Sequence, residues 1–224
     1  MLPGCRARAL SDMTGSDPAS RRPLASRDLP FFKTLAAGMA RAGISPNAIS
    51  FASIVFAICA GLAFTGTHHL TGWPLRLHWL GAAFFIQMRL LANMLDGMVA
   101  VEGGRGGPTG ELWNEAPDRV ADAAILMGAG CAAGGEPWLG FGAALVAVFV
   151  AYVRALGASV GAGQIFIGPQ AKPHRMFVLT VAAIVSLFLP AMKVALWIVI
   201  VGGVITAWRR LARIAAFLRG KTGR

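Results

Sequence analysis

The chain has 224 residues, of which 56% are hydrophobic and only 14% charged, and its mean hydropathy is +0.62. Soluble domains carry about a quarter charged residues, so this composition excludes an ordinary soluble domain and favours a membrane protein. The formal charge of +11 could indicate a nucleic-acid-binding protein. The basic residues lie between apolar segments, however, as they do in membrane proteins, and we expect no nucleic-acid partner.

The N-terminal segment, 1–27, mixes Arg, Ser, Pro, Gly and Asp without periodicity, which predicts a disordered cytoplasmic tail. The next segment, 28–46, carries apolar residues at helical spacing with basic residues off that face. This pattern predicts an amphipathic helix that lies at the membrane interface. We expect Pro46 to end this helix and Asn47 to cap the following one.

Six apolar segments follow, each near the roughly 20 residues needed to cross a bilayer. They predict an all-α integral membrane protein, with one six-helix transmembrane domain over 47–211 and a basic cytoplasmic tail over 212–224. Small residues are frequent in these segments, as expected where helices pack closely. The predicted spans are 47–66, 78–101, 114–133, 137–158, 174–190 and 191–211.

The distribution of Lys and Arg predicts the orientation of these spans. Eighteen of these residues fall in the termini and in the loops on the same side, and only two, Arg76 and Lys193, fall in the opposite loops. Cytoplasmic loops carry the excess of Lys and Arg. We therefore predict that both termini and the connection between the second and third spans are cytoplasmic.

Carboxylates, amides and glycines gather where the second predicted span leads into the third. On a helix, Asn93 and Asp96 share one face, and Asn114, Asp118 and Asp122 share another. A short Gly-rich turn joins the two spans, so we expect antiparallel helices with these faces opposed. Their oxygen atoms would suit a hard cation such as Mg²⁺. The alternative is that these polar side chains are interfacial and solvated by lipid headgroups; carboxylates inside a membrane are costly and usually functional.

This polar segment resembles the signature of the CDP-alcohol phosphotransferases, D-x2-D-G-x2-A-R-x8-G-x3-D-x3-D, with every spacing kept. Segment 46–50, PNAIS, is also similar to the motif that opens the first span of that family. Asn93 and Asn114 replace the first and third Asp, and Val101 replaces the Arg, which indicates a variant subgroup. The register here is Asn93-x2-Asp96-Gly97-x2-Ala100-Val101-x8-Gly110-x3-Asn114-x3-Asp118.

The resemblance implies a membrane enzyme of phospholipid biosynthesis. Such an enzyme transfers a substituted phosphate group from a CDP-activated lipid, such as CDP-diacylglycerol, to an acceptor alcohol and releases CMP. It implies Asp118 as the catalytic base, and one or two Mg²⁺ or Mn²⁺ ions as cofactor. The implied metal ligands are Asn93, Asp96, Asn114 and Asp118. The implied substrate-binding residues are Asn47, Gly97, Ala100, Gly110, Arg154, Lys172 and Arg175.

The resemblance also implies a bacterial-type inner or plasma membrane, a cytoplasmic active site and, since dimers are common in the family, a homodimer. Lys172 and Arg175 could instead serve topology or anionic lipids, whereas Arg154 lies within helical sequence and favours phosphate binding. The two Asn residues remove two of the four ligand charges, which weakens metal binding. The alternative function is therefore a catalytically silent relative that binds lipid or a partner subunit. A transporter is less favoured, because no inverted repeat is visible.

Overall fold

The computed structural model describes residues 29–102 and 110–222, with side chains over 29–101 and 115–221. This part of the chain is all-helical, as predicted, and contains no strand. The predicted disordered tail, 1–27, lies outside it. The helices are α2 (Pro30–Arg41), α3 (Pro46–Gly66), α4 (Gly72–Glu102), α5 (Gly110–Gly130), α6 (Pro137–Ser159), α7 (Lys172–Val185) and α8 (Met192–Thr222).

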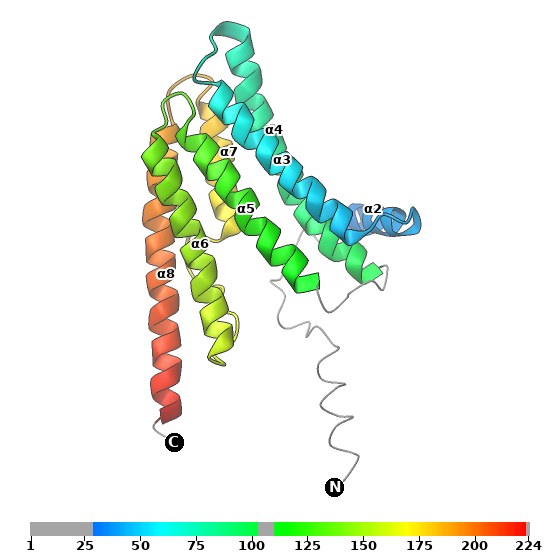
Figure 1. Ribbon diagram of the computed structural model, residues 1–224, viewed down its shortest axis with the longest axis vertical. Coiled ribbons are helices and arrows are strands. Elements are labelled where there is room, and N and C mark those ends of the chain that lie inside the picture. Colours follow the sequence, from blue (N-terminus) through cyan, green and yellow to red (C-terminus); the bar gives the residue numbers. More distant parts are fainter. Residues whose placement is uncertain (1–28, 103–109, 223–224) are drawn as a thin grey trace.

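Helices α3 to α8 form a bundle in which successive helices run in alternate directions, and α2 lies across it beside α4 (Figure 1). α3 packs against α4 and α5, α6 packs against α5 and α8, and α7 packs against α4 and α8. Each of the six segments predicted to span the membrane overlaps one of these helices. α8 continues to Thr222 and so includes most of the predicted basic tail.

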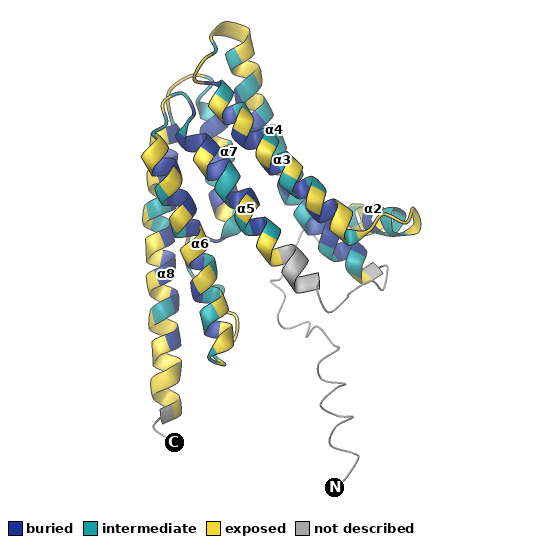
Figure 2. Ribbon diagram, viewed as in Figure 1, coloured by how far each residue is buried: buried dark blue, intermediate teal, exposed yellow. Residues whose placement is uncertain are grey.

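Four of the described helices, α3, α4, α6 and α8, are long and apolar enough to cross a membrane. α7 has 14 residues and is about 21 Å long, shorter than the roughly 30 Å hydrocarbon core of a bilayer. α5 carries several charged residues and Pro117 in its first half. Large apolar side chains such as Phe51, Leu145 and Trp208 are exposed on the outside of the bundle (Figure 2), as expected of a surface that faces lipid.

Helix α2, which the sequence predicts to be interfacial, is shorter than predicted. It ends at Arg41 and not at Pro46, because Gly43 adopts a positive φ of 77° that closes the helix. The N–H of Gly43 donates to the carbonyl of Ala40 at 3.1 Å, as in a glycine-terminated helix end. The end of α2 is therefore set by Gly43, two residues beyond the helix, and not by Pro46.

The cap of α3 also differs from the prediction. Ser45, and not Asn47, occupies the N-cap position, where its hydroxyl accepts from the N–H of Ala48 at 3.2 Å. Pro46 fills the first helical position, where its missing N–H has no helical partner to lose. Asn47 therefore lies within the first turn, with its side chain exposed.

The closest helix contacts are made through glycine. A Cβ on Gly128 of α5 would lie 2.5 Å from the Cα of Gly61 on α3, and a Cβ on Gly130 would lie 2.7 Å from the Cα of Gly140 on α6. The backbone of α5 therefore packs directly against the backbones of α3 and α6, as small residues allow in membrane bundles. These contacts fix the axial position of the polar face that α5 carries in its first half.

Candidate active site

A buried polar cluster lies where α4, α5 and α7 meet in the otherwise apolar bundle. Asp96, Asp118 and Asp122 expose 7% of their surface or less, and Arg89 and Arg175 expose 3% or less. Charges removed from water are stable only where they are paired and hydrogen-bonded. The pairing of these five side chains therefore defines the site.

Asp96 is held by α3 and by its own backbone. The Ser50 hydroxyl donates to Asp96 Oδ2 at 2.7 Å, and the Gly97 N–H donates to Asp96 Oδ1 at 2.6 Å. Electrostatic repulsion from Asp118 and attraction from Lys172 both reach this carboxylate. Ser50 belongs to the PNAIS segment, so one function of that segment is to orient a carboxylate of the next helix.

Asp118 receives donors on both of its oxygens. Arg89 Nη2 and Asn93 Nδ2 donate to Asp118 Oδ1 at 3.2 and 3.0 Å. The ammonium group of Lys172 donates to Asp118 Oδ2 and to Asn93 Oδ1. The amide of Asn93 thus turns its oxygen toward a cation and its nitrogen toward a carboxylate, the orientation that satisfies both partners.

Asp122 joins two buried arginines. Its Oδ1 accepts from Arg89 Nη2 and its Oδ2 from Arg175 Nη2, each at 2.8 Å. Arg175 Nη1 also donates to the carbonyl of Gln170 at 3.3 Å. The partners of Arg89 are thus two carboxylates on α5, Asp118 and Asp122. The signal was present, because Asp118 and Asp122 share one face of a helix expected to lie against Arg89.

Some donors of these arginines have no partner within the described residues. They are Arg89 Nε and Nη1 and Arg175 Nε, all fully buried. An unpaired buried N–H of a charged group carries a high desolvation cost. The cluster therefore has spare capacity for an acceptor oxygen.

Lys172 lies before the predicted fifth span, and burial lowers the pKa of its ammonium group to about 8. The positive charge of Arg89 acts in the same direction, whereas the carboxylates of Asp118 and Asp122 raise the pKa. At neutral pH the group is still mostly protonated. It therefore acts as a cation between Asn93 and Asp118.

The loop before α7 is fastened to α6 and α8, which places the basic first turn of α7 against α4 and α5. Thr206 Oγ1 accepts from the backbone N–H of Gln170 at 2.9 Å. The guanidinium of Arg210 donates to the carbonyls of Ile167 and Val150, each at 3.0 Å. These contacts span 36 to 60 residues of sequence, so only the folded bundle brings the basic turn to the site.

Arg154 lies beside this cluster rather than in it. Its Nη2 is 2.5 Å from a carboxylate oxygen of Glu115, which also pairs with Arg119. Arg154 also contacts Gln164 at 3.4 Å and lies over the ring of Phe166. Its side chain stays 21% exposed. Two guanidinium groups on one carboxylate leave a net positive, partly exposed group.

The other predicted residues have few contacts with the cluster. Ala100 is half-buried one turn beyond Asp96, and Asn47 is exposed. The side chain of Asn114, a predicted metal ligand, and the Gly110 position lie outside the residues whose side chains are described. Among the sequence-predicted site residues, the structure thus gathers Asn93, Asp96, Asp118, Lys172 and Arg175.

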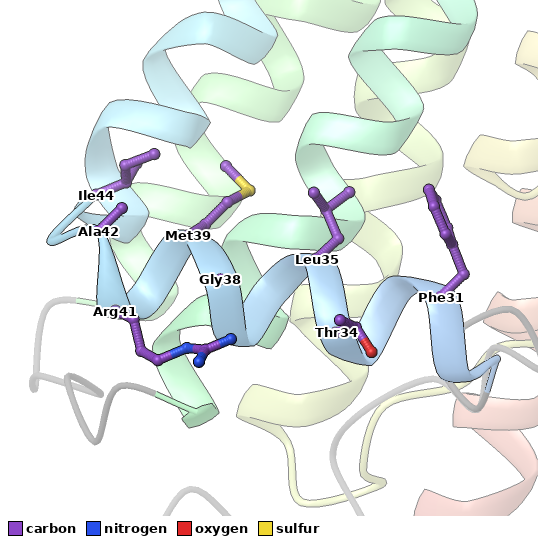
Figure 3. A pocket seen from close by; sticks show the side chains of 8 residues that line it. All are labelled: Phe31, Thr34, Leu35, Gly38, Met39, Arg41, Ala42 and Ile44. Atoms are coloured by element: carbon purple, nitrogen blue, oxygen red, sulfur yellow. The ribbon is translucent and has the colours of Figure 1, made fainter.

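Two shallow apolar grooves adjoin α2. The first, of about 490 Å³, follows α2 itself, and Phe31, Leu35 and Met39 project from one side of the helix there (Figure 3). The second, of about 270 Å³, lies between α2, α3 and α4 and reaches Leu95, the chain neighbour of Asp96. Apolar surface therefore extends from α2 to Leu95, which adjoins Asp96 in the chain.

Known enzymes of phospholipid synthesis are similar to this chain in sequence. No protein-family profile matches the chain. It is 28% identical to the phosphatidylinositol phosphate synthase of Mycobacterium marinum over 200 residues, which cover 79% of this chain and 76% of that protein. It is 27% identical to the enzyme of the same name from Mycolicibacterium smegmatis, over 76% of this chain and 78% of that protein. The chain is thus similar, over about three quarters of its length, to enzymes named phosphatidylinositol phosphate synthase.

Solved structures of a CDP-alcohol phosphotransferase share the fold. The Mycobacterium tuberculosis phosphatidylinositol phosphate synthase with CDP-DAG bound superposes with a TM-score of 0.70 at 22% identity, over 83% of this chain and 94% of that one. The same enzyme in complex with manganese and citrate gives a TM-score of 0.69, over 82% of this chain and 88% of that one. The resemblance that the motif indicated is thereby confirmed, while the assignment to an Asn-containing subgroup stays a prediction.

The residues present fit a cation. No group of three or more His, Cys, Asp or Glu arranged to hold a metal is found among the described residues. Asn93 on α4 nevertheless contacts Asp118 on α5, and Asp96 lies close enough to Asp118 for electrostatic repulsion. The position between Asn93 and Asp118 already holds the ammonium of Lys172. Carboxylate and amide oxygens are ligands that Mg²⁺ and Mn²⁺ accept.

Proposed function

We propose that this CDP-alcohol phosphotransferase relative transfers the phosphatidyl group of CDP-diacylglycerol to an acceptor alcohol and releases CMP. The observation that carries the proposal is the contact of Asn93 with Asp118 at motif spacing, with Asp96 near enough to interact electrostatically and Lys172 of α7 against the pair. The relatives named above support the same reaction class.

The proposed enzyme crosses the membrane six times, with both termini and the polar cluster on the cytoplasmic side. Successive helices run in alternate directions (Figure 1). Each of the helices α3 to α8 therefore has the end that adjoins a Lys/Arg-rich segment at the same end of the bundle. The positive-inside rule assigns that end to the cytoplasm. The short α7 and the polar α5 cross where neighbouring helices cover them. Residues 28–46 lie at the interface, and 47–211 form the catalytic domain.

The lipid donor enters this site along apolar surface. The groove between α2, α3 and α4 reaches Leu95, so an acyl chain in that groove would bring its diphosphate beside Asp96. Gly97 and Ala100 are small and leave room for a nucleotide next to α4. The spare N–H donors of Arg89 and Arg175 suit oxygen atoms of a bound anion.

Asp96 and Asp118 would hold a divalent cation, with Asn93 beside them on α4. When bound, such an ion neutralises charge on the diphosphate and makes CMP a better leaving group. Ser50 fixes the carboxylate of Asp96 for this task. The Asn114 position supplies a further amide by the motif spacing.

Asp118 acts as the base of the reaction. The acceptor hydroxyl oxygen forms a bond to the phosphorus that carries diacylglycerol, while the bond from that phosphorus to the bridging oxygen breaks. CMP leaves with the electron pair, and the proton of the acceptor hydroxyl moves to a carboxylate oxygen of Asp118. Positioning and charge stabilisation supply most of the catalysis in phosphoryl transfer.

The acceptor is proposed to carry its own phosphate. Arg154, with Arg119 on the shared Glu115, forms the partly exposed positive group that a phosphate needs. Lys172 and Arg175 stabilise the site from within, because their described hydrogen bonds go to protein oxygens. The relatives' name suggests inositol phosphate as the first acceptor to test.

The test is CMP release from CDP-diacylglycerol by the purified full chain in nanodiscs, with Mg²⁺ or Mn²⁺ and inositol phosphate, glycerol phosphate or serine as acceptor. We expect metal-dependent release with one acceptor and loss of at least about a hundredfold in Asp118→Asn. The exposed Glu136→Gln variant serves as the matched control and should keep wild-type activity. Release no higher than that of Asp118→Asn with every acceptor would refute the proposal. Metal-dependent thermal stabilisation by CDP-diacylglycerol without release would identify the silent lipid-binding relative instead.

A further inference from the structure

Lys172 takes the position that a cation would take between two predicted metal ligands. Its ammonium group donates to Asn93 Oδ1 and Asp118 Oδ2, and it comes from α7, 54 residues beyond Asp118. Its side chain is only 19% exposed. This contact occurs together with a difference from the family signature. One of the two predicted ligands that Lys172 contacts, Asn93, is an amide where the signature has a carboxylate.

We propose that the ammonium of Lys172 is a resident cation of this site, and that the chain therefore binds one divalent ion, at Asp96 and Asp118, where the family signature with four aspartates implies two. The inference rests on the proposed function for the identity of the substrate. It rests on the described contacts alone for the position of the lysine.

The charges of the cluster support a single divalent ion. With Lys172 added to the five buried side chains of the cluster, carboxylates and cationic groups are equal in number and their charges cancel: Asp96, Asp118 and Asp122 against Arg89, Lys172 and Arg175. A CDP-activated lipid brings two negative charges on its diphosphate, which one divalent ion neutralises. A second divalent ion would leave two uncompensated positive charges in a site walled by apolar helices, at a high electrostatic cost.

Neutral Asn93 is the partner that this arrangement requires. With an aspartate at this position, an adjacent pair of carboxylates would favour a divalent ion over an ammonium. The amide instead uses its oxygen for Lys172 and its nitrogen for Asp118. The loop contacts of Gln170 and Arg210 hold the start of α7 in place, so the lysine is positioned by the fold.

The experiment counts bound Mn²⁺ by electron paramagnetic resonance on the purified full chain in nanodiscs, with and without CDP. We expect one tight ion per chain in the wild type. In Lys172→Met, we expect either a second bound ion or at least about tenfold tighter binding of the first, because a neighbouring like charge has been removed. Lys193→Met is the matched control, since that lysine pairs with the exposed Glu136, and it should bind Mn²⁺ as the wild type does.

Two tight ions in the wild type would overturn the proposal. So would a Lys172→Met variant whose ion count matches that of Lys193→Met and whose affinity differs by less than about threefold. If Lys172→Met does not fold, the wild type decides the question by amine acylation read by mass spectrometry. We expect Lys172 to stay protected from acylation at saturating Mn²⁺. Increased acylation of Lys172 would show that the ion displaces the ammonium group and would overturn the proposal. These readouts do not depend on turnover, so a chain that binds one Mn²⁺ but releases no CMP would refute the proposed function and leave this inference standing.

Discussion

Asp122 is the residue whose loss should destabilise the bundle most. It is 1% exposed and accepts from two buried arginines, each at 2.8 Å. Asp122→Asn keeps the size of the side chain but removes its negative charge. The amide has one acceptor oxygen, so only one of the two arginine hydrogen bonds can remain. Removing one partner of a buried ion pair costs about 3–5 kcal/mol, and hydrogen bonds to charged groups contribute about 1.5–3 kcal/mol each. We therefore expect the free energy of unfolding to fall by about 3 kcal/mol or more.

Unfolding by SDS in mixed micelles, followed by circular dichroism, measures this change. Arg175→Met should cost less than Asp122→Asn, because Asp122 then keeps Arg89 and no carboxylate is left alone. The matched control is Glu136→Gln, which breaks an exposed ion pair with Lys193 at 3.1 Å and should change stability by less than about 1 kcal/mol. If Asp122→Asn unfolds within about 1 kcal/mol of the wild type, the buried network does not stabilise the fold and the reasoning fails.

Three further predictions follow from the geometry. Gly128→Leu should lower the melting temperature in detergent by several degrees, because a side chain there meets Gly61 at 2.5 Å; Gly81→Ala, in open space on α4, should leave it unchanged or raise it. Ser50→Ala should weaken Mn²⁺ binding several-fold, since the hydroxyl that orients Asp96 is lost, while the melting temperature moves little; an unchanged Mn²⁺ affinity would contradict this. Chelation by EDTA should abolish CMP release and added Mg²⁺ should restore it, whereas release that survives chelation would contradict a divalent-ion mechanism.

The sequence determined the helices and the polar face of each. Seven of the twelve ends of the predicted spans lie within two residues of a helix end, because Pro and Gly signals act locally along the chain. The start of α4 and the end of α8, however, lie six and eleven residues from the predicted ends. The closeness of Asp96 on α4 to Asp118 on α5 could likewise be predicted, since a short connection makes neighbouring helices antiparallel and helical periodicity places both residues on the inner face. Local signals also misled where two competed, as at Gly43 and Pro46.

Only the tertiary structure decided what surrounds that face. No spacing indicates that Lys172 reaches Asn93 across 79 residues, or that Arg175 reaches Asp122 across 53. These contacts depend on how α7 packs against α4 and on the loop held by α8, and packing geometry is a property of all the helices together. The sequence therefore identified the oxygen-bearing side chains of the site, and the tertiary structure placed the ammonium group of Lys172 between two of them, Asn93 and Asp118.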